Sequence, residues 1–355
     1  MSSAAPLAAS DDPAAGNGSG AGGGARAHVP AMDGWRGLAI MLVLGGHFLA
    51  LGGAAVLGVE LFFVLSGRLM AQILIVREEP LGRFLQRRAS RVLPAYLVFV
   101  AATSLLAFAA VGGTEAGKDV AFSAAAALFL FSNYHMAGEQ LVILFTHTWS
   151  LAVEEHSYLL LALIVLAVGR RSGTVLAVVA AAAVAAMANG LWQSLADPSV
   201  EWLYARTDIR LASIFASFAM FLALRRIALP PALLPWLCPL GLAGGSAFFL
   251  AGASEPLCYT AGTVALALSV NTVEQMAAPL RRVLEDGGLR WLGLVSFSVY
   301  LWQQLFYVDY LGGTSAVQCL AGAIACGALS FYGIERPARR YFNALGSPPQ
   351  PAPGC

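Results

Sequence analysis

The sequence predicts an all-α membrane protein with about ten transmembrane helices and both termini in the cytoplasm. Apolar side chains make up 58% of its 355 residues and charged ones only 12%, whereas roughly a quarter of the residues of a soluble domain are charged. The 21 basic residues are all Arg except Lys118, and they gather in short clusters between long apolar runs. Such clusters carry membrane topology, and they show no nucleic-acid-binding pattern.

Ten apolar runs are candidates for spans, since a helix needs about 20 mostly apolar residues to cross a bilayer. These runs cover residues 37–57, 58–76, 92–112, 144–168, 173–191, 208–224, 232–252, 257–272, 291–310 and 314–334. An eleventh run, 119–134, is short. Arginines on both sides of it, at 77–91 and at 170–171, are expected in the cytoplasm. Because the run 92–112 takes the chain to the outer side, residues 113–168 must cross back an odd number of times. A single crossing by 144–168 meets this condition, so we expect residues 119–134 to form an interfacial or re-entrant helix on the outer side.

Three stretches define the predicted domain organisation. Residues 1–31 are rich in Ala and Gly and lack the apolar core of a signal peptide, so they are expected to form a flexible tail. Residues 32–341 are expected to form one membrane domain, and 342–355 a short flexible tail. The five cysteines lack the pair spacing of a disulfide framework or a zinc site, and we expect them to be structural, with no metal required.

Ionisable groups inside spans cost about 3 kcal/mol or more, and they commonly mark function. They occur here in four spans, as His47, Glu60 with Arg68, the run Glu154-Glu155-His156, and Asp208 with Arg210.

The predicted depths of His47 and Glu154 suggest a catalytic pair. His47 follows Arg36, placed at the cytoplasmic interface, by eleven residues and so lies about 16 Å deep. The fourth span enters from outside near Phe145, which brings Glu154 and Glu155 roughly 14 to 15 Å in. An imidazole beside a carboxylate commonly acts as a general base, because the carboxylate fixes the tautomer and stabilises the imidazolium.

Each of these residues also has a purely structural interpretation. His47 could make an ordinary interhelical hydrogen bond. Glu60 and Arg68 could form a buried ion pair or lie at the interfaces, and His147 could cap the fourth span.

The segment RFLQRRASRVLPAY contains Arg87, Arg88 and Arg91 on the same side of the membrane as Arg36. It serves as a positive-inside anchor in the simplest interpretation. Arginine also presents a planar, permanently charged fork that suits phosphate groups. The four arginines are therefore candidates to bind a phosphorylated cofactor at the cytoplasmic mouth.

Six ordered segments resemble the acyltransferase-3 family of membrane O-acyltransferases across residues 32–341. They read DGWRGLAIMLVLGGH, GVELFFVLSGRLM, RRASRVLPAY, THTWSLAVEEHSYLL, SFSVYLWQQ and GIERPARRYF. The resemblance implies transfer of an acyl group, most often acetyl, from acyl-coenzyme A to a hydroxyl of a sugar or another acceptor. We expect no fused extracellular hydrolase-like domain, which some members of the family carry.

The family motifs fall on particular residues of this chain. The signature of Arg, ten residues and His falls on Arg36 and His47, and the basic motif on Arg87, Arg88 and Arg91. The remaining matches fall on Trp149, Ser150, Leu151, Glu154, Ser298, Tyr300, Leu301, Glu335 and Pro337.

Three departures from the family pattern are visible. Arg68 stands where an apolar residue is usual, His156-Ser157 replaces a common Gln-Phe, and Gln303 lies near where a histidine often occurs. The last departure puts in doubt a role for a second histidine in that span.

The combined hypothesis assigns His47, Glu154 and Arg36 to catalysis, and Arg36, Arg87, Arg88 and Arg91 to binding acyl-coenzyme A. His47 would act as a general base or carry the acyl group transiently. The pocket would be lined by Glu60, Ser66, His147, Trp149, Ser150, Glu155 and Tyr300.

The expected partners are the lipid bilayer of the cell membrane, the acyl-coenzyme A donor and a sugar or glycan acceptor, with no nucleic acid. Two alternatives remain open. The acceptor could be a small-molecule metabolite, or the chain could be a transporter or flippase, because charges at mid-membrane also mark substrate paths.

Overall fold

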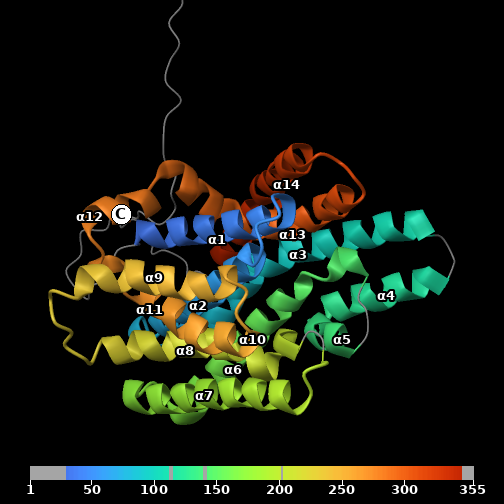
Figure 1. Cartoon of the computed structure of the whole chain (residues 1–355). Coiled ribbons are helices and arrows are strands. Elements are labelled where there is room, and N and C mark those ends of the chain that lie inside the picture. The colour runs from blue at the N-terminus through green and yellow to red at the C-terminus, as the bar shows by residue number, and fades with distance from the viewer. Residues whose placement is uncertain (1–28, 112–114, 139–141, 201–202, 346–355) are drawn as a thin grey trace, which may run out of the picture.

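The computed structural model describes residues 29–111, 115–138, 142–200 and 203–345, and all secondary structure in these ranges is helical (Figure 1). The predicted tails lie mostly outside the described residues. The α-helices are α1 Pro30–Phe48, α2 Ala54–Ala71, α3 Leu81–Val111, α4 Glu115–Leu128, α5 Ser132–Gly138, α6 Thr148–Val168, α7 Ser172–Ala196, α8 Thr207–Leu224, α9 Leu234–Leu250, α10 Glu255–Leu257, α11 Thr263–Asn271, α12 Ala278–Leu284, α13 Gly287–Leu311, α14 Ala316–Ser330 and α15 Arg336–Leu345. Three π-helical turns are η1 Gln72–Val76, η4 Cys258–Gly262 and η6 Phe331–Glu335, and three 3₁₀ turns are η2 Ile143–Phe145, η3 Leu203–Ala205 and η5 Val273–Gln275.

The predicted fold class is confirmed, since the described chain is an all-α membrane protein. Among the described residues, six helices are long and apolar enough to cross a membrane. They are Ala54–Val76, Leu81–Val111, Ile143–Val168, Ser172–Ala196, Thr207–Leu224 and Ala316–Leu345. The count of ten spans stays a prediction.

The boundary predicted between the first two spans, at residues 57 and 58, is wrong. Helix α1 already begins at Pro30, where a proline costs no hydrogen bond, and it ends at Phe48. The backbone then reverses through Ala50 and Gly53, whose φ angles of 53° and 73° are left-handed. Apolar composition continues through this turn, so hydropathy alone gives no sign of it.

Helices α1 and α13 lie side by side and run in the same direction, and glycines hold them close. A Cβ atom at Gly37 would lie 2.0 Å from the carbonyl oxygen of Leu289, and one at Gly293 would lie 1.9 Å from that of Asp33. Small residues allow this close approach of helix backbones in membranes. Side chains of α1 therefore stay in register with those of α13 along its length.

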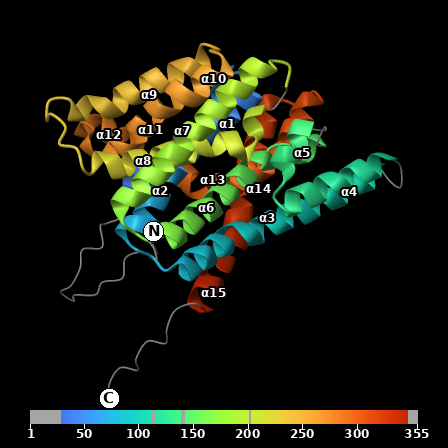
Figure 2. The ribbon, with the colours of Figure 1, turned by 90° about the horizontal axis from the view of Figure 1, so that it is seen from below.

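Helix α2 lies between two apolar cores. One core joins it to α6, α7 and α8, and the other joins it to α1, α9 and α11. Figure 2 shows α7 crossing in front of the bundle, with α9, α11 and α12 grouped next to α8. The central position of α2 explains why most of its residues are buried.

The short run at 119–134 forms two helices, α4 and α5, separated by a turn at Leu130 with a φ of 59°. Helix α4 lies alongside the 31-residue α3, and both extend away from the rest of the bundle in Figures 1 and 2. The interfacial placement of this run stays a prediction. The last helix, α15, packs against the opposite part of α3.

Candidate active site

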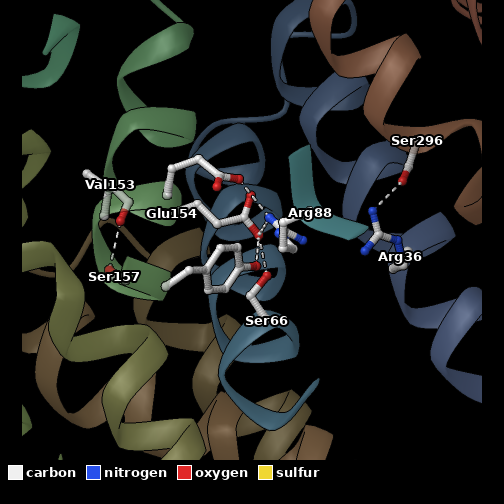
Figure 3. Close-up of polar contacts among 9 residues, drawn as sticks. Arg36, Ser66, Arg88, Val153, Glu154, Ser157 and Ser296 are labelled. Carbon is white, nitrogen blue, oxygen red and sulfur yellow. Dashed lines mark hydrogen bonds and ion pairs between the residues drawn. The ribbon is translucent and has the colours of Figure 1, made fainter. Parts of the chain in front are cut away.

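Five polar side chains from α2, α3 and α6 form a first cluster, here called the arginine cluster, with Arg36 beside it. Ser66 Oγ donates a hydrogen bond of 2.5 Å to Glu154 Oε1, and the Tyr158 hydroxyl donates to the same oxygen. Arg88 Nη2 donates to Glu155 Oε1 at 2.8 Å, lies 3.8 Å from Glu154 Oε1, and its guanidinium stacks 4.0 Å from the Tyr158 ring. Figure 3 shows Ser66, Arg88 and Glu154 pointing toward one another.

Arg36 reaches the edge of this cluster from α1. Its Nη2 donates to Ser296 Oγ of α13 at 3.3 Å, and Figure 3 shows it beside Arg88. Glu154 and Arg91 lie within electrostatic reach of the Arg36 guanidinium. Arg36 lies six residues after the start of α1, about 9 Å along the helix, and its predicted place at the cytoplasmic interface stays a prediction.

Glu335 adds a third carboxylate to this end of the site. It is buried in η6, where it accepts a hydrogen bond of 2.7 Å from Ser298 Oγ. Arg91, Arg36 and Arg339 all lie within electrostatic reach of it. Arg87, in contrast, is half-exposed and pairs with Glu79 at 3.1 Å. Of the three predicted arginines of α3, Arg88 and Arg91 therefore face the cluster and Arg87 points away.

A second cluster, here called the histidine cluster, surrounds His47 near the end of α1. His47 Nδ1 lies 2.7 Å from Gln303 Oε1, and the ring stacks on Tyr307 with centroids 4.5 Å apart and planes 24° from parallel. Gln303 and Tyr307 lie one helical turn apart on α13. Two residues of one neighbouring helix thus fix the position and plane of the imidazole.

The start of α6 brings further polar groups to the histidine cluster. His147 is buried, within electrostatic reach of His47, and its ring packs on Phe99 and Tyr300. The Tyr300 hydroxyl lies 2.7 Å from Ser150 Oγ and 3.0 Å from the His147 carbonyl oxygen. The predicted residues His47, His147, Ser150 and Tyr300 are therefore brought together.

The expected pairing of His47 with Glu154 is corrected by this geometry. Glu154 is bonded to Ser66 and Tyr158 at the arginine cluster, whereas Gln303 is bonded to His47. Helix α6 runs opposite to α1, so His147 reaches the level of His47 and Glu154, two turns further on, reaches the level of Arg36. The sequence predicted a first span at residues 37–57, whereas α1 covers Pro30–Phe48, so His47 lies in the last turn of its helix and not near the middle.

One face of α13 connects the two clusters. Ser296, Tyr300, Gln303 and Tyr307 follow one another at spacings of four, three and four residues, which places them on one side of a helix. Ser296 touches Arg36 and the last two touch His47. A stripe of neutral polar side chains therefore runs beside α1 from the arginine cluster to His47.

Glu60 and Trp149, two other predicted pocket residues, lie outside both clusters. Glu60 Oε2 pairs with Arg210 Nη2 at 2.6 Å, and Glu60 Oε1 accepts from Thr263 at 2.5 Å. Glu60 and Arg210 are 0% and 1% exposed, so this pair belongs to the packing of α2, α8 and α11. Trp149 packs on Phe63 within the apolar core. Structural roles account for both.

Arg68, the departure noted in α2, has its partners outside both clusters. It donates to the Val270 carbonyl at 2.7 Å and to Glu274 Oε1 at 2.6 Å. It therefore ties α2 to the end of α11 and does not add free charge to the site.

Sequence reasoning gave no role to several residues that complete the site. Ser298 and Glu335 were marked only by the family motifs, and Gln303 only as a departure from them. The remaining residues carry no signal in the sequence, because only a partner on another helix distinguishes them; they are Tyr158, Ser296, Gln304 and Tyr307. Within the described ranges, no group of three or more His, Cys, Asp or Glu side chains is arranged to hold a metal ion.

The fold and site together define a helical membrane protein with a polar tract between an arginine cluster and a half-buried histidine. Comparison with known families gives the particular class. The acyltransferase-3 family, described as an acyltransferase domain, matches residues 29–331. The chain belongs to this family of acyltransferases, as its motifs indicated.

Named relatives support this membership. The chain is 26% identical over 359 residues to peptidoglycan O-acetyltransferase OatA of Listeria monocytogenes, covering 89% of this chain and 56% of that protein. It is 27% identical over 353 residues to a protein named as membrane-bound transacylase BcsY of Komagataeibacter xylinus, covering 88% and 83%. A segment of 152 residues is 32% identical to O-acetyltransferase OatA of Staphylococcus aureus, covering 39% and 25%.

The chain thus spans about half the length of the Listeria relative, and the segment that matches the Staphylococcus relative covers a quarter of that protein. No solved structure matches the chain.

Proposed function

We propose that this protein transfers an acyl group, acetyl in the first instance, from acyl-coenzyme A to a hydroxyl of a carbohydrate or glycan precursor at the cell membrane. Family membership supports acyl transfer, and the relatives named as peptidoglycan or other O-acetyltransferases support a glycan acceptor. The observation that carries the proposal is the polar stripe of α13, because it joins the arginines at one end of the site to the half-buried imidazole of His47 at the other.

The donor binds through its phosphates at the arginine cluster. Arg88 is already engaged by two carboxylates, so it holds Glu154 and Glu155 in place. The one hydrogen bond described for the Arg36 side chain goes to a neutral hydroxyl, which leaves most of the five donors of its guanidinium available for an anion. Arg36 and Arg91 are therefore the anion-binding residues of the proposal, and Arg87 contributes only at the exposed edge.

The thioester then lies along the α13 stripe. Arg36 and His47 are eleven residues apart on α1, which corresponds to about 16 Å. A long, flexible thioester arm bridges such a separation. Tyr300, which is hydrogen-bonded to Ser150, lies between the two ends and can position the thioester carbonyl.

At the histidine cluster, His47 acts as general base. It takes the proton of the acceptor hydroxyl as that oxygen attacks the thioester carbon. A carbon–oxygen bond forms, the carbon–sulfur bond breaks, and the departing thiolate receives the proton back from His47. The products are the acylated acceptor and free coenzyme A, with no change in oxidation state.

The test uses the purified full chain in lipid nanodiscs with radiolabelled acetyl-coenzyme A. Candidate acceptors are peptidoglycan fragments, neutral oligosaccharides and a small-molecule alcohol. We expect release of free thiol and labelled ester only when an acceptor is present, and loss of both in His47→Ala. Thioester cleavage that is independent of every acceptor, or full activity in the variant, would overturn the proposal.

The transporter alternative is tested by the same preparation. Reconstituted vesicles that move intact acceptor without ester formation would favour it. Acetyl groups on surface glycans, compared between a strain with the gene and one without, would then identify the acceptor class.

A further inference from the structure

The buried glutamine that faces His47 is hydrogen-bonded to a second glutamine. The two side chains form a hydrogen-bond relay in which each donor and acceptor can be assigned in only one way. Gln303 and Gln304 are adjacent on α13 and are 0% and 3% exposed. The Gln304 side chain ends on η2, the short turn that precedes α6. These two glutamines thus connect His47 on α1 to the backbone just before the start of α6.

The donor-to-acceptor direction of this hydrogen-bond relay is fixed at the end where Gln304 meets Ile143. Gln304 Nε2 lies 2.7 Å from the backbone carbonyl oxygen of Ile143 and 3.2 Å from Thr146 Oγ1. A backbone carbonyl can only accept a hydrogen bond, so the amide nitrogen of Gln304 must be the group that faces it. The oxygen of Gln304 is then turned toward Gln303.

The second link follows from the first. Gln303 Nε2 lies 3.5 Å from Gln304 Oε1. If the Gln303 amide were reversed, two amide oxygens would face each other in a buried place, with no donor between them. The amide nitrogen of Gln303 therefore faces Gln304, and its oxygen faces His47.

The third link determines the protonation of the imidazole. Gln303 Oε1 lies 2.7 Å from His47 Nδ1, and an amide oxygen cannot donate. In the neutral ring Nδ1 must then carry the hydrogen, which leaves the lone pair on Nε2. Tyr307 stacks on the ring and holds its plane, so this lone pair has one direction.

We propose that Gln303 is a positioning residue that, with Gln304, fixes His47 in the Nδ1–H tautomer and makes Nε2 the atom that accepts the proton. The tautomer stands on the geometry alone, whereas its use in catalysis rests on the proposed function. A neutral amide sets the tautomer without placing a negative charge beside the ring. The sequence showed Gln303 only as a departure from the family pattern.

The tautomer can be read directly by ¹⁵N nuclear magnetic resonance on full-length protein labelled at histidine in lipid bilayers, because protonated and unprotonated ring nitrogens have well-separated shifts. The protein has five histidines, and the His47 signals are those absent from the spectrum of the His47→Ala variant. We expect Nδ1–H in the wild-type protein. A wild-type spectrum with Nε2–H, or with both tautomers equally populated, overturns the proposal.

Variants separate positioning from packing. Gln303→Leu and Gln304→Leu should each reduce the preference for Nδ1–H, and Gln303→Glu should keep it because a carboxylate also accepts. The matched control is Gln318→Leu on α14, where the side chain is exposed, and it should leave the His47 signals unchanged. A His47 spectrum unaffected by Gln303→Leu would contradict the assignment.

Kinetics on the same variants supply the catalytic readout. Gln303→Leu should lower kcat for acyl transfer by about tenfold or more, with KM for the donor unchanged, as expected for an interaction that acts on the reacting group. Gln303→Glu should retain more activity than Gln303→Leu. Equal kcat in wild type and Gln303→Leu overturns the positioning role. Absence of transfer in a wild-type protein that shows the Nδ1–H tautomer would instead refute the proposed function.

Discussion

The arginine cluster of α2, α3 and α6 and the histidine cluster around His47 are connected by α1 and α13, but their key groups have partners of opposite kinds. Arg88 is surrounded by carboxylates, and Glu335 has three arginines within electrostatic reach. His47 contacts a neutral amide and a neutral phenol ring. The difference fits the proposed function, which uses charge at the end proposed to bind the donor phosphates and neutral hydrogen bonds at the end proposed to move a proton.

The comparison also corrects the general-base argument made from the sequence. A carboxylate beside an imidazole is a familiar arrangement, and both residue types are present in nearby spans. In this fold Glu155 is paired with Arg88, and Glu154 accepts hydrogen bonds from Ser66 and Tyr158. These partners hold both carboxylates away from His47. The carboxylates balance the arginine charge, and the hydrogen-bond partner of His47 is the neutral amide of Gln303.

The largest expected effect is on the histidine cluster. His47→Ala should lower acyl transfer by about 10²- to 10⁴-fold, the usual contribution of a general base, while binding of the donor at the arginine cluster is retained. Turnover by thiol release and donor affinity by calorimetry measure the two separately. Loss of donor binding in this variant would show that the two clusters are not separable.

A charged pair outside both clusters provides the next test. Glu60→Gln leaves Arg210 buried without its carboxylate, and removal of one partner of a buried pair typically costs about 3–5 kcal/mol. We expect a marked fall in the thermal midpoint of the purified protein in detergent. Glu115→Gln is the control, because Glu115 is 87% exposed in its pair with Lys118, and it should leave the midpoint unchanged.

Register between the clusters depends on glycines. Gly37→Ala would place a Cβ atom 2.0 Å from the Leu289 carbonyl oxygen and push α1 away from α13. Such overpacking costs about 1–3 kcal/mol, and activity should fall with stability because Arg36 and His47 both contact α13.

The control for this variant is Gly82→Ala at the start of α3. A Cβ atom there meets nothing within 4 Å, so the change should be neutral or stabilising by about 0.5–1 kcal/mol. Equal thermal midpoints for the two variants would contradict the packing described for α1 and α13.

The smallest expected effect concerns donor binding. Arg91→Ala should raise KM for acyl-coenzyme A by about tenfold, since a hydrogen bond to a charged group contributes about 1.5–3 kcal/mol, and kcat should change less. Arg83→Ala on the exposed face of the same helix is the matched control. If both arginines affect KM equally, α3 attracts the donor by general charge and not through a defined site.

Much of the architecture was predictable because a bilayer leaves few solutions for an apolar chain. With no water to satisfy backbone groups, spans must be helices, whereas the cytoplasmic placement of the arginine clusters stays a prediction. The level of residues along a helix was less predictable. The first span was expected to cover residues 37–57, yet α1 ends at Phe48, so His47 lies in its last turn and the predicted level of His47 relative to Glu154 was wrong.

The site shows the same limit residue by residue. His47, Arg36, Arg88 and Glu154 stand out because an ionisable group in a span is costly. Gln303, Tyr307 and Ser296 carry no such signal, since their cost depends on whether a neighbouring helix supplies a partner.

By itself, then, the sequence determined that this chain is a helical membrane protein of the acyltransferase-3 family, and it marked the ionisable residues to consider. Hydropathy and charge act locally, so the order of residues is enough to reveal them. Only the tertiary structure decided which partner each group meets, because a hydrogen bond between helices depends on register, direction and close approach. For His47 that partner is Gln303, reached across a contact that Gly37 and Gly293 make possible.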